Sequence, residues 1–561
     1  MYSKNNIFSR SNQRREIQNR IWKLLFIFIL LFSFLIWKII NYMYLNAESL
    51  KTMADAQYTI EEEYGLNYNL IDYKGKDLLD YEVNFYAIID PLDYSKFNKY
   101  TSKYDMQTLI FTLRNYNSDY DLEKIKDSGN GQKIRYKIDE NTFDKLKDIK
   151  GVKGFYIYAA NELMGGRPWK IENLLINTKY YDTHGDSVLK SDDSLEIQIY
   201  NKTKSNEYTK IRFAKGVDGE ISEGQIIEPE NNVNVRLTLD KDIQDSVEDI
   251  LHEEKYEQIG VVLMESSTGK IRAMAKKDDS SYNANLGIPT TNGAIPGSIF
   301  KVIVEEAGLD MNLIDKNEIF PLNSTYLPDA HETLLQQYTL GEALTYSSNN
   351  TFAQIGRRVG LENMYDYAEK QGLLRKVLNI QQENIGDFGV DVSTSNPGEK
   401  SAASIGQKTR ITPLQAISIP NTIINNGIYV QPIIIDAYVD DNGQIIEGFT
   451  AKTKRVLKKE TAETVKSHMM NVVNKGTGTE ASIEGMNIGG KTGTTEYFEN
   501  KKELSDGWFV GFFNLRGKNY SMVVFVKNIV VSLIEDENSE GGGTTAAPIF
   551  KEIVNALKEL D

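Results

Sequence analysis

One apolar stretch near the N-terminus limits what the rest of the chain can become. Residues Lys23–Leu45, KLLFIFILLFSFLIWKIINYMYL, carry few charges. As a helix, this stretch is about long enough to cross a hydrocarbon core of ~30 Å. Basic residues precede the stretch and an acidic residue, Glu48, follows it. The positive-inside rule therefore predicts a cytoplasmic tail at 1–22, an anchor at 23–45 and an extracellular remainder.

A cleaved signal peptide is the alternative interpretation of this stretch. The apolar run is long for a signal peptide, and no clear small-residue cleavage site follows it. The 561-residue sequence contains no second apolar run of comparable length. The sequence therefore favours one retained, single-pass anchor in the cell membrane.

Composition excludes several kinds of chemistry. The chain has no cysteine, so thiolate catalysis, disulfides and zinc–thiolate sites are ruled out. The four histidines are scattered without metal-ligand spacing, so we expect no metal, no cofactor and a catalytic base other than histidine. They are His184, His252, His331 and His468. The formal net charge of −15 argues against nucleic acid as a partner.

The composition and the predicted secondary structure of the exported part change near residue 232. Residues 46–232 are polar, with strands predicted at Tyr81–Asp90 and Gly151–Ala160 and a helical period between them. From Val233 onward the pattern is a strand, an amphipathic helix at 240–254 and a hairpin at 259–275. This order predicts an α+β pedestal at 46–232 and a second domain at 233–561, built on a sheet with helices packed on it.

A Pro-Gly turn before an apolar helical pattern places a serine and a lysine together. In GAIPGSIFKVIVEEAG, Gly293–Gly308, Lys301 follows Ser298 by three residues. Residues three apart share a helix face, so the lysine amine can lie beside the serine oxygen and act as its base. A lysine serves as a base only when burial or a nearby cation favours its neutral form, and apolar neighbours surround this one.

A helix cap is the plain structural alternative for Ser298, because serine is a favoured N-cap residue. The chain also contains a second Ser-x-x-Lys pair, Ser187 and Lys190, in the polar stretch THGDSVLKSDDS. We interpret that stretch as a solvated loop. By itself, the spacing at Ser298 does not separate a nucleophile from a cap.

Two further segments carry side chains that suit the same chemistry. In GEALTYSSNNTFAQIG, the hydroxyl of Ser347 could relay a proton and the amide of Asn349 could hold both substrate and lysine. In MNIGGKTGTTE, Lys491 and Thr492 could bind an anionic group on a strand edge that Gly493 leaves open. Local alternatives exist for both, since Ser and Asn make turns and a Gly-rich segment can be a simple hairpin.

Together the three segments resemble a known family. They occur in the order and approximate spacing of the penicillin-binding protein and serine β-lactamase superfamily. The three motifs are Ser298-x-x-Lys301, Ser347-x-Asn349 and Lys491-Thr492-Gly493. Four other stretches resemble high-molecular-mass members: GAIPGSIFK, SIGQKTRITPLQ (404–415), DGWFVGFF (506–513) and GGTTAAPIFKEI (542–553). The resemblance covers residues 233–561 and implies a transpeptidase fold, an antiparallel sheet flanked by helices.

The resemblance implies a role for each motif residue. Ser298 would attack a D-alanyl-D-alanine stem peptide and form an acyl-enzyme, with Lys301 as the acylation base. Ser347 would relay a proton, and Asn349 would orient both substrate and lysine.

The strand residues would complete the site. Lys491 and Thr492 would bind the terminal carboxylate, Gly493 would leave room for substrate, and Thr494 would lie on the same edge. The backbone N–H groups of Ser298 and Thr494 would form the oxyanion hole. β-Lactams would acylate the same serine as covalent inhibitors.

The region before the catalytic domain sets the subclass. No glycosyltransferase motif is found there, and Asn67–Pro91 resembles the N-terminal motif of class B, the monofunctional members. That class usually has Asp-Arg-Asn-Gly where this chain has Asp72-Tyr73-Lys74-Gly75, and GGRPWKIENL (165–174) resembles another pedestal segment. We therefore expect an elongated α+β pedestal and a membrane glycan polymerase as partner.

Three functions stay open at this point. A crosslinking D,D-transpeptidase is favoured. A D,D-carboxypeptidase or β-lactamase would use water as acceptor, but such enzymes rarely need a large anchored pedestal. A β-lactam-binding sensor or scaffold is the third possibility, although only the 22 residues before the anchor are available for cytoplasmic output.

Overall fold

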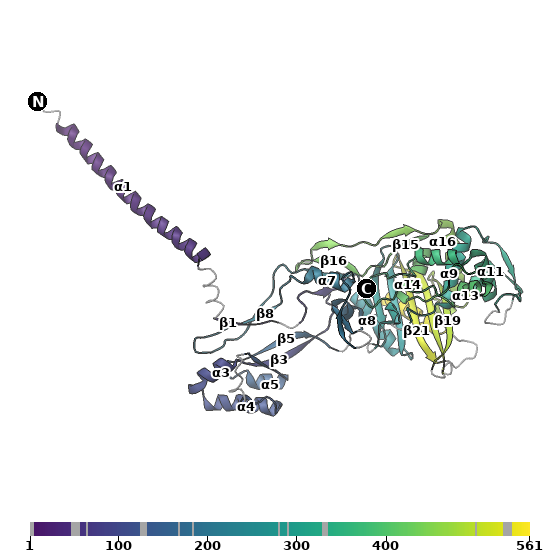
Figure 1. Ribbon diagram of the computed structural model, residues 1–561, viewed down its shortest axis with the longest axis horizontal. Coiled ribbons are helices and arrows are strands. Elements are labelled where there is room, and N and C mark those ends of the chain that lie inside the picture. The colour runs from purple at the N-terminus through teal and green to yellow at the C-terminus, as the bar shows by residue number, and fades with distance from the viewer. Residues whose placement is uncertain are drawn as a thin grey trace. The chain divides into compact units, whose positions relative to one another are not determined.

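The computed structural model describes most of the chain (Figure 1). The described residues are 5–45, 57–62, 65–123, 132–165, 169–181, 185–278, 281–288, 291–327, 335–499, 502–530 and 541–560. Glu48, His184 and His331 lie outside them. The contacts divide the chain into two compact units: the first contains residues 1–64, 83–162 and 209–228, and the second contains 65–82, 163–208 and 229–561. The functional boundary at residue 232 stays a prediction.

The N-terminal apolar stretch is helical. Helix α1 spans Asn5–Ile40, and a π-helical turn, Asn41–Leu45, follows it. Within the described part of the chain, Arg14–Met43 is the one segment long and apolar enough to cross a membrane. Its large side chains point outward: Trp22 is 68% and Phe32 is 63% exposed. A helix that displays apolar side chains on every face suits lipid better than water.

The first unit is built from two small sheets. Strand order is β4-β3-β5 in one and β1-β8-β9 in the other. The strands are β1 (Tyr58–Glu62), β3 (Tyr81–Ile89), β4 (Ile134–Ile138), β5 (Phe155–Leu163), β8 (Lys210–Ala214) and β9 (Gln225–Ile227). The helices are α3 (Pro91–Phe97), α4 (Lys103–Tyr116) and α5 (Glu140–Leu146). Both predicted strands and the helix between them are confirmed.

An antiparallel five-stranded sheet forms the centre of the second unit. Its strand order is β12-β11-β21-β20-β19, and β19 and β21 are its yellow strands in Figure 1. The strands are β11 (Gln258–Glu265), β12 (Lys270–Lys276), β19 (Gly489–Glu499), β20 (Lys502–Leu515) and β21 (Lys518–Val530). The predicted hairpin at 259–275 is therefore confirmed as β11 and β12.

Helices cover both faces of this sheet, because its central strands are apolar on both sides. On β20, Phe509 and Phe513 join one core with α8 (Lys241–Glu253) and α17 (Ala546–Glu559). Trp508 and Val510 point the other way, into the core that contains α9 (Lys301–Asp310) and α16 (Lys459–Lys475). The predicted sheet with flanking helices is confirmed.

The remaining elements complete the second unit. Its other helices are α6 (Ile171–Ile176), α7 (Leu195–Thr203), α10 (Leu340–Thr345), α11 (Asn349–Val359), α12 (Leu361–Lys370), α13 (Pro397–Ser404), α14 (Pro413–Ala416) and α15 (Ser418–Ile424). A second sheet has the order β17-β16-β10-β2. Its strands are β2 (Leu70–Ile71), β10 (Asn234–Leu237), β16 (Ile435–Val439) and β17 (Ile445–Gly448). Three two-stranded pairs join β6 (Lys179–Tyr181) to β7 (Ser187–Leu189), β13 (Ile319–Pro321) to β14 (Gln337–Thr339), and β15 (Ile428–Val430) to β18 (Thr453–Arg455).

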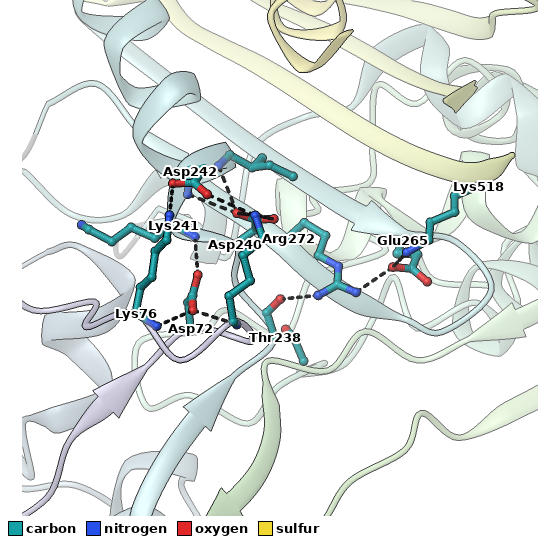
Figure 2. Close-up of polar contacts among 11 residues, drawn as sticks. Asp72, Lys76, Thr238, Asp240, Lys241, Asp242, Glu265, Arg272 and Lys518 are labelled. Carbon is teal, nitrogen blue, oxygen red and sulfur yellow. Dashed lines mark hydrogen bonds and ion pairs between the residues drawn. The ribbon is translucent and has the colours of Figure 1, made fainter. Parts of the chain in front are cut away.

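The segment Asp72–Gly75 docks onto the start of α8 (Figure 2). The buried carboxylate of Asp72 accepts a hydrogen bond from the Lys74 backbone N–H at 2.8 Å and one from the Lys241 N–H at 3.1 Å. Lys74 also reaches the helix cap, with its Nζ 3.1 Å from a carboxylate oxygen of Asp240. The segment Asp72–Gly75 therefore makes a firm turn, and that turn holds residues 65–82 in the second unit.

A neighbouring arginine links the same turn to the central hairpin. Arg272 donates to Glu265 Oε2 at 2.7 Å and to the carbonyl oxygen of Thr238 at 3.1 Å, as Figure 2 shows. Its guanidinium also lies over the Tyr73 ring, 4.3 Å from the ring centroid. A stacked arginine that donates to two acceptors is worth more than an exposed lysine pair, because its planar group is already ordered.

The second Ser-x-x-Lys pair is not a solvated loop, and that interpretation was wrong. Ser187 is exposed at the start of β7, but the Lys190 side chain is fully buried. Lys190 Nζ donates to Glu196 Oε1 at 2.8 Å and to the Leu174 carbonyl oxygen at 2.9 Å. The polar sequence around Lys190 hid this burial, because the carboxylate that neutralises the lysine comes from the following helix.

Candidate active site

Ser298 lies in a 3-10 turn, Gly297–Phe300, that leads directly into α9. The N-cap positions of these two helical segments are occupied by Pro296 and Phe300, so Ser298 is not the cap of either. Gly297 has a φ of 55°, and a Cβ there would lie 2.5 Å from the carbonyl oxygen of Thr494. The turn therefore needs glycine in order to seat the half-buried Ser298 against β19.

The Lys301 ammonium is surrounded by acceptors from the second motif. Its Nζ donates to the carbonyl oxygen of Ser347 at 2.6 Å, to Ser347 Oγ at 3.1 Å and to Asn349 Oδ1 at 2.7 Å. The Phe352 ring centroid lies 5.7 Å from the same nitrogen. The structure thus brings together Ser347, Asn349 and Lys301, as expected. Asn349 fixes the direction in which the lysine points.

Ser347 occupies a backbone conformation that L-residues rarely adopt. Its φ is 60°, and it lies between the end of α10 and Ser348, the N-cap of α11. Such a conformation costs of order 1–3 kcal/mol and persists only where surrounding contacts enforce it. Here it places Ser347 Oγ 3.1 Å from Lys301 Nζ and 2.9 Å from Lys491 Nζ. One hydroxyl therefore joins two lysines from different motifs.

Lys491 is a fully buried lysine at the centre of this network. Its Nζ donates to Ser347 Oγ and to the carbonyl oxygen of Thr492, both at 2.9 Å. Burial lowers the pKa of Lys491 to about 7, because the charged form loses its hydration. Near neutral pH, this group therefore exchanges readily between its charged and neutral forms.

The packing of the protein itself requires glycine at position 493. A Cβ on Gly493 would lie 2.5 Å from the carbonyl oxygen of Pro296 and 3.0 Å from Ile299 Cγ2. The missing side chain therefore lets β19 approach the turn that carries Ser298. Its expected role, to leave room for a substrate, stays a prediction.

Hydroxyl groups of the same strand tie it to its neighbours. Thr494 Oγ1 accepts a hydrogen bond from the Gly542 N–H at 3.2 Å, and Thr495 donates to the Ile295 carbonyl oxygen at 3.1 Å. Thr492 Oγ1 and Thr477 Oγ1 are 2.7 Å apart. The assignment of substrate binding to Thr492 and Thr494, and of the oxyanion hole to two backbone N–H groups, stays a prediction.

The sequence did not predict a histidine–carboxylate pair that joins α16 to α9, the helix that begins at Lys301. His468 Nδ1, on α16, lies 2.5 Å from Oε1 of Glu305, a buried residue of α9. Burial lowers the pKa of His468, but the carboxylate of Glu305 raises it more, so the net shift is upward. The ring also packs on Gly341, where a Cβ would lie 2.8 Å from His468 Cδ2.

Helix α16 therefore touches all three motif-bearing segments. It packs against α9, α10 and β19, and Thr477, two residues beyond its end, reaches Thr492 of β19. The Thr477 N–H also donates to the carbonyl oxygen of Thr345 at 3.2 Å. The signal in the sequence was the carboxylate pair Glu305–Glu306 inside an otherwise apolar helix, which requires polar partners.

Within the described ranges, no group of three or more His, Asp or Glu side chains is arranged to hold a metal ion. The reactive groups around Lys301 and Lys491 are hydroxyls, amines and amides, which suit nucleophilic and proton-transfer chemistry.

Comparison with protein families and curated proteins agrees with these motifs. The family described as "Penicillin binding protein transpeptidase domain" matches residues 259–555. Stage V sporulation protein D of Bacillus subtilis is 26% identical over 454 residues, which covers 74% of this chain and 67% of that protein. Penicillin-binding protein PbpB of Mycolicibacterium smegmatis is 25% identical over 492 residues, covering 81% of this chain and 71% of that protein.

Solved structures share the fold. A peptidoglycan synthetase from Bifidobacterium adolescentis aligns with a TM-score of 0.61 at 20% identity, covering 89% of this chain and 96% of that chain. Penicillin binding protein 3 from Mycobacterium tuberculosis, complexed with aztreonam, aligns with a TM-score of 0.58 at 20% identity and the same coverage. The expected transpeptidase fold is confirmed.

Proposed function

Because the chain belongs to the penicillin-binding protein transpeptidase family, we propose that it crosslinks peptidoglycan stem peptides through an acyl-enzyme on Ser298. The observation that supports this most is the position of Ser347 Oγ, within hydrogen-bonding distance of both Lys301 Nζ and Lys491 Nζ. A chain of lysine, hydroxyl and lysine can carry a proton between a nucleophile and a leaving group.

Acylation begins when Ser298 Oγ attacks the carbonyl carbon between two D-alanine residues. Lys301, in its neutral form, takes the serine proton, since its side chain is already directed by Ser347 and Asn349. The amide C–N bond breaks, and the leaving D-alanine amine receives a proton through Ser347. The charged form of Lys491 attracts the terminal carboxylate of the donor peptide.

Deacylation completes the transfer. The amine of a neighbouring stem peptide attacks the ester, a new amide forms, and the proton returns to Ser298. A β-lactam would open on the same serine and remain bound as an ester. If water were the acceptor, the enzyme would be a D,D-carboxypeptidase or β-lactamase, and without turnover it would be a scaffold or sensor.

Membrane attachment and partners belong to the same proposal. We place residues 1–22 in the cytoplasm, the anchor in the cell membrane and the catalytic domain outside. The long exposed apolar helix supports the anchor, and the basic residues before it support this direction. A membrane glycan polymerase that supplies uncrosslinked strands is the expected partner.

Mass spectrometry after treatment with a fluorescent penicillin tests the nucleophile. We expect a single adduct, on Ser298, and none in Ser298→Ala. Ser187→Ala is the matched control, because Ser187 is the exposed serine of the second Ser-x-x-Lys pair, and it should be labelled like the wild type. An adduct that persists in Ser298→Ala would contradict the assignment.

A crosslinking assay separates the reaction types. The full-length protein is incubated with lipid-linked peptidoglycan and a polymerase, and crosslinked stem-peptide dimers are expected. Free D-alanine with only shortened monomers would indicate a carboxypeptidase. Rapid release of hydrolysed penicillin would indicate a β-lactamase, and a stable adduct with no product from peptidoglycan would indicate a scaffold.

A further inference from the structure

A cavity outside the proposed active site lies in the same compact unit as the active-site residues. It encloses about 380 Å³ between α6 and α8 and has no part in the chemistry proposed above. Residues of one face of α8 form one wall, and residues near α6 form the other. The polar lining used below comprises Asp80, Lys170, Glu172, Asp245, Glu248 and Asp249.

Glu172 is a buried carboxyl group of this cavity that keeps an unpaired oxygen. Its side chain lies in the first turn of α6, and the residue is only 4% exposed. Among the described residues, no donor lies within hydrogen-bonding distance of Glu172 Oε2. Burial, followed by the nearby carboxylate of Glu248, raises the pKa of Glu172 to about 7. An unpaired buried carboxyl oxygen is costly, so it calls for a donor from elsewhere.

The two lysines of the lining and Gln244 are engaged by other carboxylates, Glu248 and Asp245. Lys170 Nζ lies 2.5 Å from Glu248 Oε2, and Gln244 Nε2 donates to Glu248 Oε1 at 2.8 Å. Lys241, the other lysine of the lining, has its Nζ 3.4 Å from a carboxylate oxygen of Asp245. Each of these side chains already has an acidic partner, so Glu172 is the acid that a ligand would have to satisfy.

The charge of the lining indicates the sign of that ligand. Two lysines face five acidic side chains, so the cavity has an excess of negative charge. A ligand that completes Glu172 must bring hydrogen-bond donors and positive charge. The described residues contain no arrangement of three or more ligands for a metal ion, and the volume suits a chain of several atoms. An organic cation therefore fits better than a bare metal ion.

We propose that this cavity binds a primary ammonium group carried on a short flexible chain, with Glu172 as its counter-ion. The ammonium offers three N–H donors and Glu172 Oε2 accepts one of them. The acidic residues at the mouth, Asp245 and the exposed Asp249, attract the cation toward the opening. The ligand could be a free polyamine or an amine-bearing side chain of a peptide, which share this chemistry.

Calorimetric titration of the full-length protein in detergent tests the proposal with two probes. Cadaverine represents a free diamine and Nα-acetyl-lysine amide represents a peptide side chain. Nα,Nε-diacetyl-lysine amide, which lacks the charge, is the matched negative probe. We expect at least one of the two amines to bind, the diacetylated compound not to bind, and the stronger amine to identify the source.

The variant Glu172→Gln keeps the shape and removes the charge. It should weaken binding by roughly tenfold or more, because a charged hydrogen bond is lost. Asp249→Asn, on the exposed rim, should change binding by no more than about twofold. Penicillin acylation should be the same in all three proteins, which shows that Glu172→Gln is folded. Absence of binding by both amines, or equal binding by wild type and Glu172→Gln, would overturn the proposal.

Discussion

Two buried ionisable residues in the same unit, Lys491 and Glu172, show how context decides what burial does. Burial moves the pKa of each toward neutrality: Lys491 falls from 10.5 to about 7, and Glu172 rises from 4.5 to about 7. Lys491 donates to Ser347 Oγ and the Thr492 carbonyl oxygen at 2.9 Å each. Glu172 Oε2 has no such partner among the described residues.

The difference distinguishes two kinds of site. At Lys491 the buried group has its hydrogen-bond partners, and we call this the finished site. At Glu172 one buried oxygen needs a donor from a ligand. Around Lys491, the protein supplies acceptors, so the charge costs stability but is held in a working position. Around Glu172 Oε2, the described residues supply a cavity and no donor. A buried polar group without a hydrogen bond destabilises the folded state, and a bound ligand that donates to it removes this penalty.

The largest expected effect comes from removing the lysine of the finished site. Lys491→Met should lower the rate of penicillin acylation by about 100-fold or more, because Ser347 loses a donor and the site loses its charge. Stopped-flow measurement with a fluorescent penicillin gives the rate. Glu172→Gln is the contrasting variant and should acylate at the wild-type rate. Equal rates in wild type and Lys491→Met would remove Lys491 from the reaction.

Stability should respond to pH in opposite directions at the two sites. The pKa of Lys491 is lower in the folded state, so its charge destabilises the fold as pH falls from 10.5 toward 7. Lys491→Met should therefore gain about 3–5 kcal/mol over wild type at pH 6, and lose that advantage above pH 10.5. Urea unfolding at both pH values measures it, and a pH-independent difference would contradict the mechanism.

For Glu172, the sign is reversed. Its folded pKa is raised, so the unfolded chain releases its proton first and stability falls as pH rises from 4.5 to about 7. Glu172→Gln should therefore be about 3 kcal/mol more stable than wild type at pH 8, relative to the difference at pH 4. Urea unfolding of both proteins at the two pH values checks this. Asp249→Asn should show no such dependence.

A smaller effect is expected from breaking the contact between His468 on α16 and Glu305 on α9. The raised pKa of His468 means that its stabilising contact with Glu305 is complete below pH 6.5 and is lost as pH rises through the folded value. His468→Asn should lower the acylation rate by about tenfold at pH 6 and by less at pH 8.5. His252→Asn, an exposed histidine on α8, is the matched control. A rate loss that is the same at both pH values would indicate a purely structural role.

The smallest effect tests the link between α16 and β19. Thr477→Val removes the hydroxyl that lies 2.7 Å from Thr492 Oγ1 while keeping the shape. The loss of one neutral hydrogen bond is worth about 1 kcal/mol, so acylation should slow by about fivefold. Thr464→Val, at a half-buried position on α16 whose hydroxyl donates only to the Glu460 carbonyl oxygen of the same helix among the contacts described, should leave the rate unchanged. A Thr477→Val rate within the error of wild type would show that the contact does not position β19.

Much of the site could be predicted from the sequence because motif residues are local. The spacing of Ser298 and Lys301 predicted a shared face, and the strand–turn–strand pattern at 259–275 predicted the hairpin of β11 and β12. The role of Gly493 could not be predicted, because its close neighbour, the Pro296 carbonyl oxygen, is about 200 residues away in the chain. The complete burial of the Lys190 side chain could not be predicted either, because its neighbours in the sequence are polar.

By itself, the sequence determined the apolar anchor, the order of the three motifs and the class of chemistry that a cysteine-free, histidine-poor chain can perform. Only the tertiary structure decided that Ser347 joins two lysines, one 46 and the other 144 residues away, and that Glu172, which lines a cavity, has no donor for its Oε2 among the described residues. Periodicity and composition depend on near neighbours, whereas hydrogen-bond partners and desolvation depend on the path of the whole chain.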